Sequence, residues 1–192
     1  MTAPAARWPL LWVDPRIHAT ECARFDSFVA IGPTETDCSI WIGAIGGDGY
    51  GRFYITRDGK GRCVRPNRFA LARALRRPLG PDSLALHECD NPLCVKIAPE
   101  GASKLHVVDG DQRDNMIRMA RTRRGGGRWL LRRDHVADRR AKSVALRDAA
   151  RNGWDQEAIT NVLQRAAEPG LFDLTQLFTP RSKGAPDECE EH

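Results

Sequence analysis

The chain has 192 residues, of which 41% are hydrophobic and 29% charged, a composition typical of a folded globular protein. No apolar run approaches the roughly 18 residues that a membrane-spanning helix needs, so we expect no contact with a membrane. The N-terminal stretch lacks the apolar core and cleavage site of a signal peptide, which predicts a cytoplasmic protein. The length suits one domain with a small helical appendage.

Positive charge is concentrated in one part of the sequence. The formal net charge is only +5, yet residues 112–142 hold 11 basic and 3 acidic side chains. Such a segment is suited to contact phosphate groups. A solvated, arginine-rich linker is the alternative interpretation.

The first half of the chain predicts mostly strands, because glycine-rich turns separate short β-forming runs. We expect an irregular N-terminal arm over residues 1–23, a short helix over 24–30, strands over 39–44 and 50–55 in a meander that continues through 63–64, and a helix over 67–77. Phe69, Ala72 and Leu75 would form the apolar face of that helix.

The second half predicts a strand–loop–strand–helix unit followed by helices. We expect strands over 84–87 and 106–108, helices over 111–124, 138–151 and 155–166, and a disordered tail after residue 180. Residues 145–165 fit either a plain helical hairpin or a helix-turn-helix that reads bases. An apolar cluster over 171–178 is expected to dock onto these helices. The fold class is therefore α+β.

A cysteine–histidine constellation carries the densest chemistry. Cys89 and Cys94 flank a tight Asp-Asn-Pro turn, which brings two thiolates to one side of a loop. His106 supplies a third ligand, and Cys38 can supply a fourth. A closed site with three sulfur ligands and one nitrogen ligand is typical of structural Zn²⁺. Alternatives remain open: these are ordinary buried thiols, or the fourth ligand is another cysteine, namely Cys63, Cys22 or, least favoured, Cys189.

The order of motifs resembles the HNH, or His-Me finger (ββα-metal), endonucleases, especially the zinc-containing phage and mobile-element type that includes homing enzymes. The matching segments are Cys38-Ser39-Ile40-Trp41-Ile42-Gly43, Gly49-Tyr50-Gly51, Asn67-Arg68, His87-Glu88-Cys89-Asp90-Asn91-Pro92-Leu93-Cys94 and Asp114-Asn115. The resemblance covers about residues 24–128. It implies a small β-meander and a ββα-metal finger with structural zinc, a helical appendage over 129–180, and a tail over 181–192. It also favours Cys38 as the fourth zinc ligand.

The sequence departs from that family pattern at several positions. Lys96-Ile97 stand where the family usually has Asn-Pro, and extra residues precede His106. Asn67 replaces the histidine of the usual His-Arg pair. These differences leave the proposed catalytic pair in place.

The resemblance implies a metal-dependent hydrolase of DNA phosphodiester bonds. His87, at the end of a strand, would activate the attacking water, since a neutral imidazole suits that task. Asn115 would hold a single catalytic Mg²⁺, replaceable by Mn²⁺, through its amide oxygen. By analogy Arg68, or Arg65, would support the scissile phosphate. Taken alone, His87 fits a zinc ligand or a structural histidine equally well, and Asn115 fits a helix-terminal polar residue.

The resemblance implies double-stranded DNA as the partner, and we expect arginines near the catalytic motif to bind its phosphates. The candidates are Arg65, Arg118, Arg121, Arg123, Arg124 and Arg128. The competing functions are a catalytically inactive, zinc-stabilised DNA-binding protein and a phage packaging-associated accessory protein active only with its partner. A homodimer would allow both DNA strands to be cut.

Overall fold

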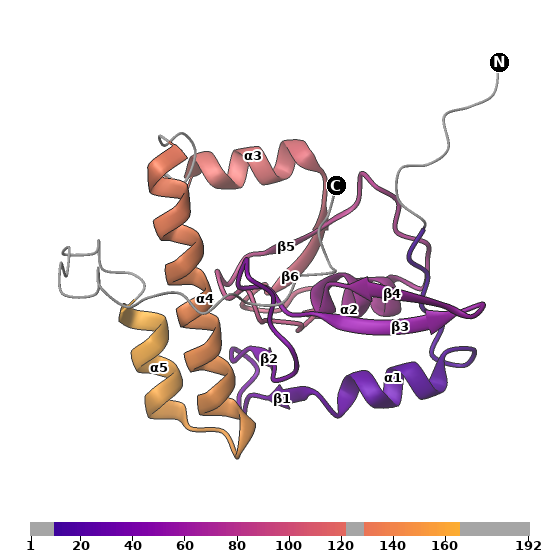
Figure 1. Ribbon diagram of the computed structural model, residues 1–192, viewed down its shortest axis with the longest axis horizontal. Coiled ribbons are helices and arrows are strands. Elements are labelled where there is room, and N and C mark those ends of the chain that lie inside the picture. Colours follow the sequence, from indigo (N-terminus) through magenta and orange to yellow (C-terminus); the bar gives the residue numbers. More distant parts are fainter. Residues whose placement is uncertain (1–9, 122–128, 166–192) are drawn as a thin grey trace.

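The computed structural model describes residues 10–121 and 129–165, without the side chains of 129–135 and 165. This part of the chain forms α1 (Ala19–Asp26), β1 (Val29–Ile31), β2 (Ser39–Trp41), β3 (Phe53–Arg57), β4 (Lys60–Val64), α2 (Pro66–Leu75), β5 (Leu84–His87), β6 (Val107–Gly110), α3 (Gln112–Arg121), α4 (Trp129–Arg151) and α5 (Gln156–Arg165) (Figure 1). The predicted α+β class is confirmed. None of the helices described is both long and apolar enough to cross a bilayer.

The strands pair as separate antiparallel hairpins, which corrects the predicted meander. Within the described residues β1 pairs with β2, β3 with β4 and β5 with β6, and each pair forms its own sheet. Residues 46–51, which we call the glycine loop, separate β2 from β3. The Gly46 amide donates to the Tyr50 carbonyl and the Arg52 amide donates to the Ala44 carbonyl, so the chain reverses direction within this loop.

The edge of β2 that does not face β1 pairs with the loop that follows β5. The amide of Trp41 donates to the Leu93 carbonyl at 2.8 Å, and the amide of Val95 donates to the Ser39 carbonyl at 2.9 Å. An antiparallel bridge joins Ile40 to Cys94 between them. This non-local pairing brings Cys38, which directly precedes β2, beside Cys94.

Four aromatic rings fill the centre of the core. Phe25, Trp41, Phe53 and Phe69 are each at most 3% exposed, and the centroids of the rings in contact lie 4.7–5.5 Å apart. They come from α1, β2, β3 and α2, and mixed stacked and edge-to-face packing is favourable for such rings. The cluster therefore joins the first half of the chain into one core.

The described part of the predicted irregular arm packs into this core: residues 10–18 form no helix or named strand, as predicted, whereas residues 19–23 belong to α1. Leu11 and Val13 are at most 1% exposed, and Leu11 exchanges both backbone hydrogen bonds with Leu79. Helix α1 begins at Ala19 and ends at Asp26, so the helix predicted over 24–30 is displaced. The displacement follows from burial of Cys22 and Phe25, which lie on one face of α1.

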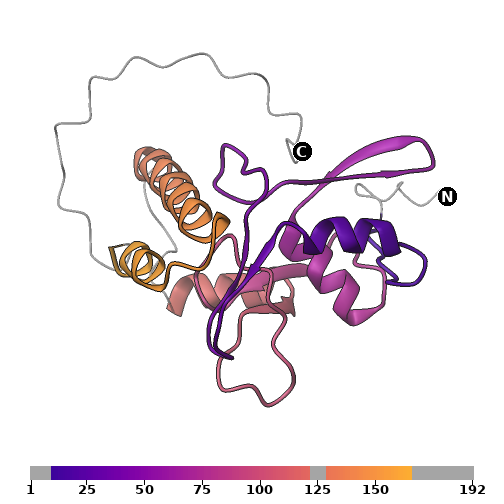
Figure 2. The same cartoon turned by 90° about the horizontal axis from the view of Figure 1, so that it is seen from below.

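Helix α4 packs against β2 and the glycine loop, and α5 lies beside α4 (Figures 1 and 2). The Ser143 hydroxyl donates to the Gly49 carbonyl and Arg139 Nε donates to the Asp48 carbonyl, both at 2.6 Å. Gly49 has φ +83°, and a Cβ there would lie 2.9 Å from the Arg140 backbone nitrogen. A glycine at this position therefore allows α4 to approach. The apolar cluster expected over 171–178 and the expected tail lie outside the described residues.

Candidate metal centre

The loop between Cys89 and Cys94 is a tight turn closed by its own asparagine. Asp90 takes a positive φ of 55°, a conformation that Asp and Asn tolerate better than most residues. The fully buried Asn91 accepts the Leu93 amide on its side chain at 2.9 Å and the Cys94 amide on its carbonyl at 3.0 Å. We call residues 87–94 the knuckle loop. Its geometry holds both thiols on one side.

Four side chains converge at this loop, as the sequence predicted. One ligand atom from each of Cys38, Cys89, Cys94 and His106 can be chosen so that all lie within 4.8 Å of one another. His106 Nδ1 lies 3.6 Å from the sulfurs of both Cys38 and Cys94. On a zinc tetrahedron with bonds of about 2.3 Å to sulfur and about 2.0 Å to nitrogen, an N–S edge is about 3.5 Å. The donor set and its spacing therefore fit a metal such as zinc.

The protonation of the thiols also fits a metal site. Hydrogen bonds from the Cys89 and Cys94 thiols lower the pKa of Cys38 to about 3. Burial raises the pKa of Cys94 well above its usual value, and hydrogen bonds with the other two thiols raise it further. The pKa of Cys89 is lowered as well, although its hydrogen bond with Cys38 acts in the opposite direction. Without metal, protons therefore remain on the thiols of highest pKa, above all Cys94. A divalent cation would replace those protons, so its affinity should fall as the pH falls.

The two competing cysteines lie elsewhere. Cys22 is buried in α1, and Cys63 lies in β4, where it pairs across the hairpin with Tyr54. Neither belongs to the convergent group. Cys38 is therefore the cysteine that completes the cluster, and Cys189 lies outside the described residues.

His87 ends β5 and is held by a residue to which the sequence assigned no role. The Asn67 side-chain amide donates to the Ala85 carbonyl at 2.9 Å and lies 3.1 Å from His87 Nε2. Because the carbonyl fixes the NH₂ orientation, the same group must donate to His87 Nε2, which leaves the proton of a neutral ring on Nδ1. His87 Nδ1 is buried and has no hydrogen-bond partner within residues 10–121 and 129–164. The only signal for this contact in the sequence was the position of Asn67 in the Asn67-Arg68 pair.

Tyr50 adds a second neighbour that sequence reasoning missed. Its ring centroid lies 6.1 Å from that of His87, with the planes inclined by 32°. The Arg65 and Arg139 guanidinium groups lie 4.4 and 5.1 Å from the Tyr50 centroid. The glycine loop therefore approaches His87 through an aromatic ring flanked by two cations.

Asn115 lies on α3, in the unit formed by β5, β6 and that helix. Asp111 and Asp114 cap the helix reciprocally: each carboxylate accepts the other residue's backbone amide, at 2.9 and 3.0 Å. Asn115 is half-buried in the first turn of α3, as the alternative interpretation of a helix-terminal polar residue also expects.

Three of the arginines predicted for the site have protein partners. Arg118 pairs with Glu88 at 3.3 Å and Asp90 at 2.7 Å, and its side chain is 13% exposed. Arg65 pairs with Asp48 at 3.1 Å. Arg68 donates to the carbonyls of Ser83 and Gly80. These contacts give each arginine a structural role in the free protein.

The remaining predicted DNA contacts divide into two groups. Arg121 is exposed at the end of α3, in a position that leaves its guanidinium accessible. Arg123, Arg124 and Arg128 lie outside the described residues.

Comparison of the chain with protein-family models, with curated proteins and with solved structures gives no match.

Proposed function

We propose that this protein is a metal-dependent DNA endonuclease whose β5–β6–α3 unit is a ββα-metal finger. The observation that carries the proposal is the convergence of Cys38, Cys89, Cys94 and His106 within 4.8 Å. Zinc bound there would fix the knuckle loop, which begins with His87, against β6, which leads into α3.

The catalytic step assigned to this finger is hydrolysis by activated water. His87 would accept a proton from the water, and Asn115 would help to hold Mg²⁺ or Mn²⁺ against the phosphate. Among the described residues the cysteine–histidine cluster is the only group of three or more ionisable ligands. The catalytic metal would therefore depend on phosphate oxygens and water for most of its ligands, as Mg²⁺ tolerates.

A second candidate is a zinc-stabilised DNA-binding protein without catalysis. It is favoured by the environment of His87, because Nε2 already receives the Asn67 amide and Nδ1 is buried. For catalysis the Asn67 hydrogen bond would have to yield to water. The two candidates share the zinc site and differ only in this step.

A plasmid-nicking assay with Mg²⁺ or Mn²⁺ tests the proposal. We expect His87→Ala and Asn115→Ala to lower the cleavage rate about 10²–10⁴-fold while both variants retain one zinc per chain and bind DNA. His18→Ala is the matched control and should cleave normally, because the His18 imidazole accepts a hydrogen bond from the nearby Asp14 amide and lies outside the proposed site. Equal cleavage by all four proteins would assign any nicking to a contaminant. DNA binding with no nicking under either metal would favour the second candidate.

A further inference from the structure

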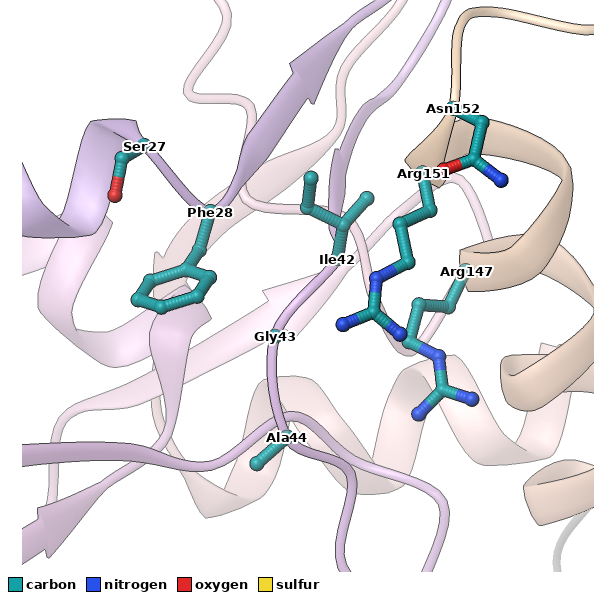
Figure 3. Close-up of a pocket in the computed structure, with 8 residues that line it drawn as sticks. All are labelled: Ser27, Phe28, Ile42, Gly43, Ala44, Arg147, Arg151 and Asn152. Carbon is teal, nitrogen blue, oxygen red and sulfur yellow. The ribbon is translucent and has the colours of Figure 1, made fainter.

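A hollow separate from the metal centre lies between the β1 start, the segment after β2 and the C-terminal end of α4. Its volume is about 430 Å³, within the range of small-ligand pockets. The lining residues are Ser27, Phe28, Ile42, Gly43, Ala44, Arg147, Arg151 and Asn152 (Figure 3).

One wall of the hollow is cationic. The guanidinium groups of Arg147 and Arg151, one helical turn apart on α4, both extend into it (Figure 3). Arg147 is balanced by Asp148 at 3.0 Å. The Arg151 guanidinium has no ion pair or hydrogen bond with the described residues. Two arginines with one carboxylate leave positive charge for a planar or tetrahedral oxyanion, which arginine binds in a bidentate manner.

The facing wall is aromatic. Phe28 lies on the other side of Ile42 and Gly43 from the arginines (Figure 3), and it is 39% exposed. Its ring is supported by Trp41, at 5.5 Å between centroids and 49° between planes. A half-exposed ring on a rigid support can stack against any nucleobase.

The floor between the two walls is fixed in place. Trp41 Nε1 donates to the Ala44 carbonyl at 2.9 Å, and the Ile42 amide donates to the Phe28 carbonyl at 2.9 Å. A Cβ on Gly43 would lie 2.6 Å from the Trp41 ring, so this residue must be small for the segment to lie flat over the indole. A ligand would therefore enter a site that is already formed.

We propose that this hollow binds a nucleotide, with its phosphate on Arg147 and Arg151 and its base on Phe28. The ligand is either a free nucleotide or one unit of a DNA strand, since both offer the same phosphate and ring. The proposal does not depend on nuclease activity or on the metal centre.

Binding is measured by titrating the zinc-loaded full chain with deoxyadenosine monophosphate at 0.15 M salt, without added Mg²⁺. The reporters are the NMR signals of the Trp41 indole N–H and the Arg147 and Arg151 Nε–H groups. We expect saturable shifts with a dissociation constant below about 1 mM, and at least about tenfold weaker binding of inorganic phosphate or deoxyadenosine alone.

Variants separate a built site from general charge attraction. Arg151→Gln and Arg147→Gln should each weaken binding about tenfold, and Phe28→Leu should weaken nucleotide binding while leaving phosphate binding unchanged. Arg16→Gln removes the same charge from an exposed position outside the hollow and should leave binding unchanged. Unchanged thermal melting of each variant excludes unfolding as the cause.

A single-stranded tetranucleotide distinguishes the two sources of ligand. Tighter binding than that of the mononucleotide, with the same loss in Arg151→Gln, identifies a DNA strand, whereas equal binding identifies a free nucleotide. The proposal is overturned if no probe gives saturable shifts up to about 10 mM, which is too weak for a specific site. It is also overturned if Arg16→Gln and Arg151→Gln weaken binding equally.

Discussion

The knuckle loop, which begins at His87, and the glycine loop, which approaches His87 through Tyr50, are held by different forces. The knuckle loop presents two buried or half-buried thiols to Cys38 and His106, an arrangement that a single ion would complete. The glycine loop is held by many smaller contacts, from the Ser143 hydroxyl, Arg52, Arg65 and Arg139. We infer that one loop depends on an all-or-none event, whereas the other loses stability gradually as contacts are removed.

The largest effect should follow loss of the metal from the knuckle loop. We expect Cys94→Ala, or removal of zinc by a chelator, to unfold the finger, because structural zinc contributes roughly 10–16 kcal/mol in small finger peptides. Urea denaturation and zinc analysis measure this. Cys22→Ala removes a buried thiol outside the cluster, and should keep one zinc and lose only about 1 kcal/mol. A folded, zinc-free wild-type protein with an unchanged melting temperature would contradict the metal assignment.

Gly49→Ala should produce the next largest effect, on the glycine loop. The residue has φ +83°, and the added Cβ would meet α4 backbone atoms at 2.9 and 3.0 Å. We expect a loss of about 2–4 kcal/mol from backbone strain and displacement of α4. Gly59→Ala is the matched control: its φ is +72° and a Cβ there meets nothing within 4 Å, so only the strain of about 1–2 kcal/mol remains. If Gly49→Ala and Gly59→Ala have equal urea midpoints, then the contact between α4 and the glycine loop adds nothing to the cost of a side chain at residue 49.

Asp48→Asn tests the electrostatic contacts of the same loop. Burial opposes ionisation of Asp48, but the Tyr50 amide, Arg52 and Arg65 outweigh it and lower its pKa. The charge therefore stabilises the folded state above the unfolded pKa of about 3.9, and this contribution disappears as the pH falls through the lower folded pKa. We expect the variant to be about 1 kcal/mol less stable at pH 7. Urea titrations from pH 7 to pH 2 measure the difference in unfolding free energy between the wild type and Asp48→Asn, which should decrease as the pH falls. If this difference does not change with pH, the charge of Asp48 is not its cause.

The smallest effect is expected at Arg118, on the side of the knuckle loop. Because Glu88 and Asp90 already neutralise this arginine, Arg118→Gln should cost less than about 1 kcal/mol. It should also change DNA affinity less than Arg121→Gln, which alters an exposed arginine on the same helix. Salt-dependent DNA-binding measurements compare the two. A decrease of about one in the salt slope for Arg118→Gln would instead make Arg118 a phosphate ligand.

Local sequence patterns predicted many elements but not their partners. The glycine turns predicted the β3–β4 hairpin, and the apolar spacing predicted α2, both to within a few residues. Of the predicted apolar face, Phe69 and Ala72 are buried, whereas Leu75, at the end of the helix, is 39% exposed. The meander was wrong because the edge of β2 pairs with residues 93–95, a contact over some fifty residues that no local pattern encodes. The buried N-terminal segment was missed for the same reason, since Leu11 finds its partner at Leu79.

At the metal centre, residue type and spacing alone pointed to three candidate ligands: Cys89 and Cys94, which flank the tight turn, and His106. For the fourth ligand, local spacing left Cys38, Cys22 and Cys63 open, and the family resemblance favoured Cys38. The folded chain gives the physical reason: the pairing of β2 with the knuckle loop brings Cys38, and neither of the other two, to the cluster. The contact of Asn67 with His87 likewise depends on how α2 packs against β5. Ligand chemistry is a local property of residue type and spacing, whereas the completion of a shell depends on contacts between segments distant in the chain.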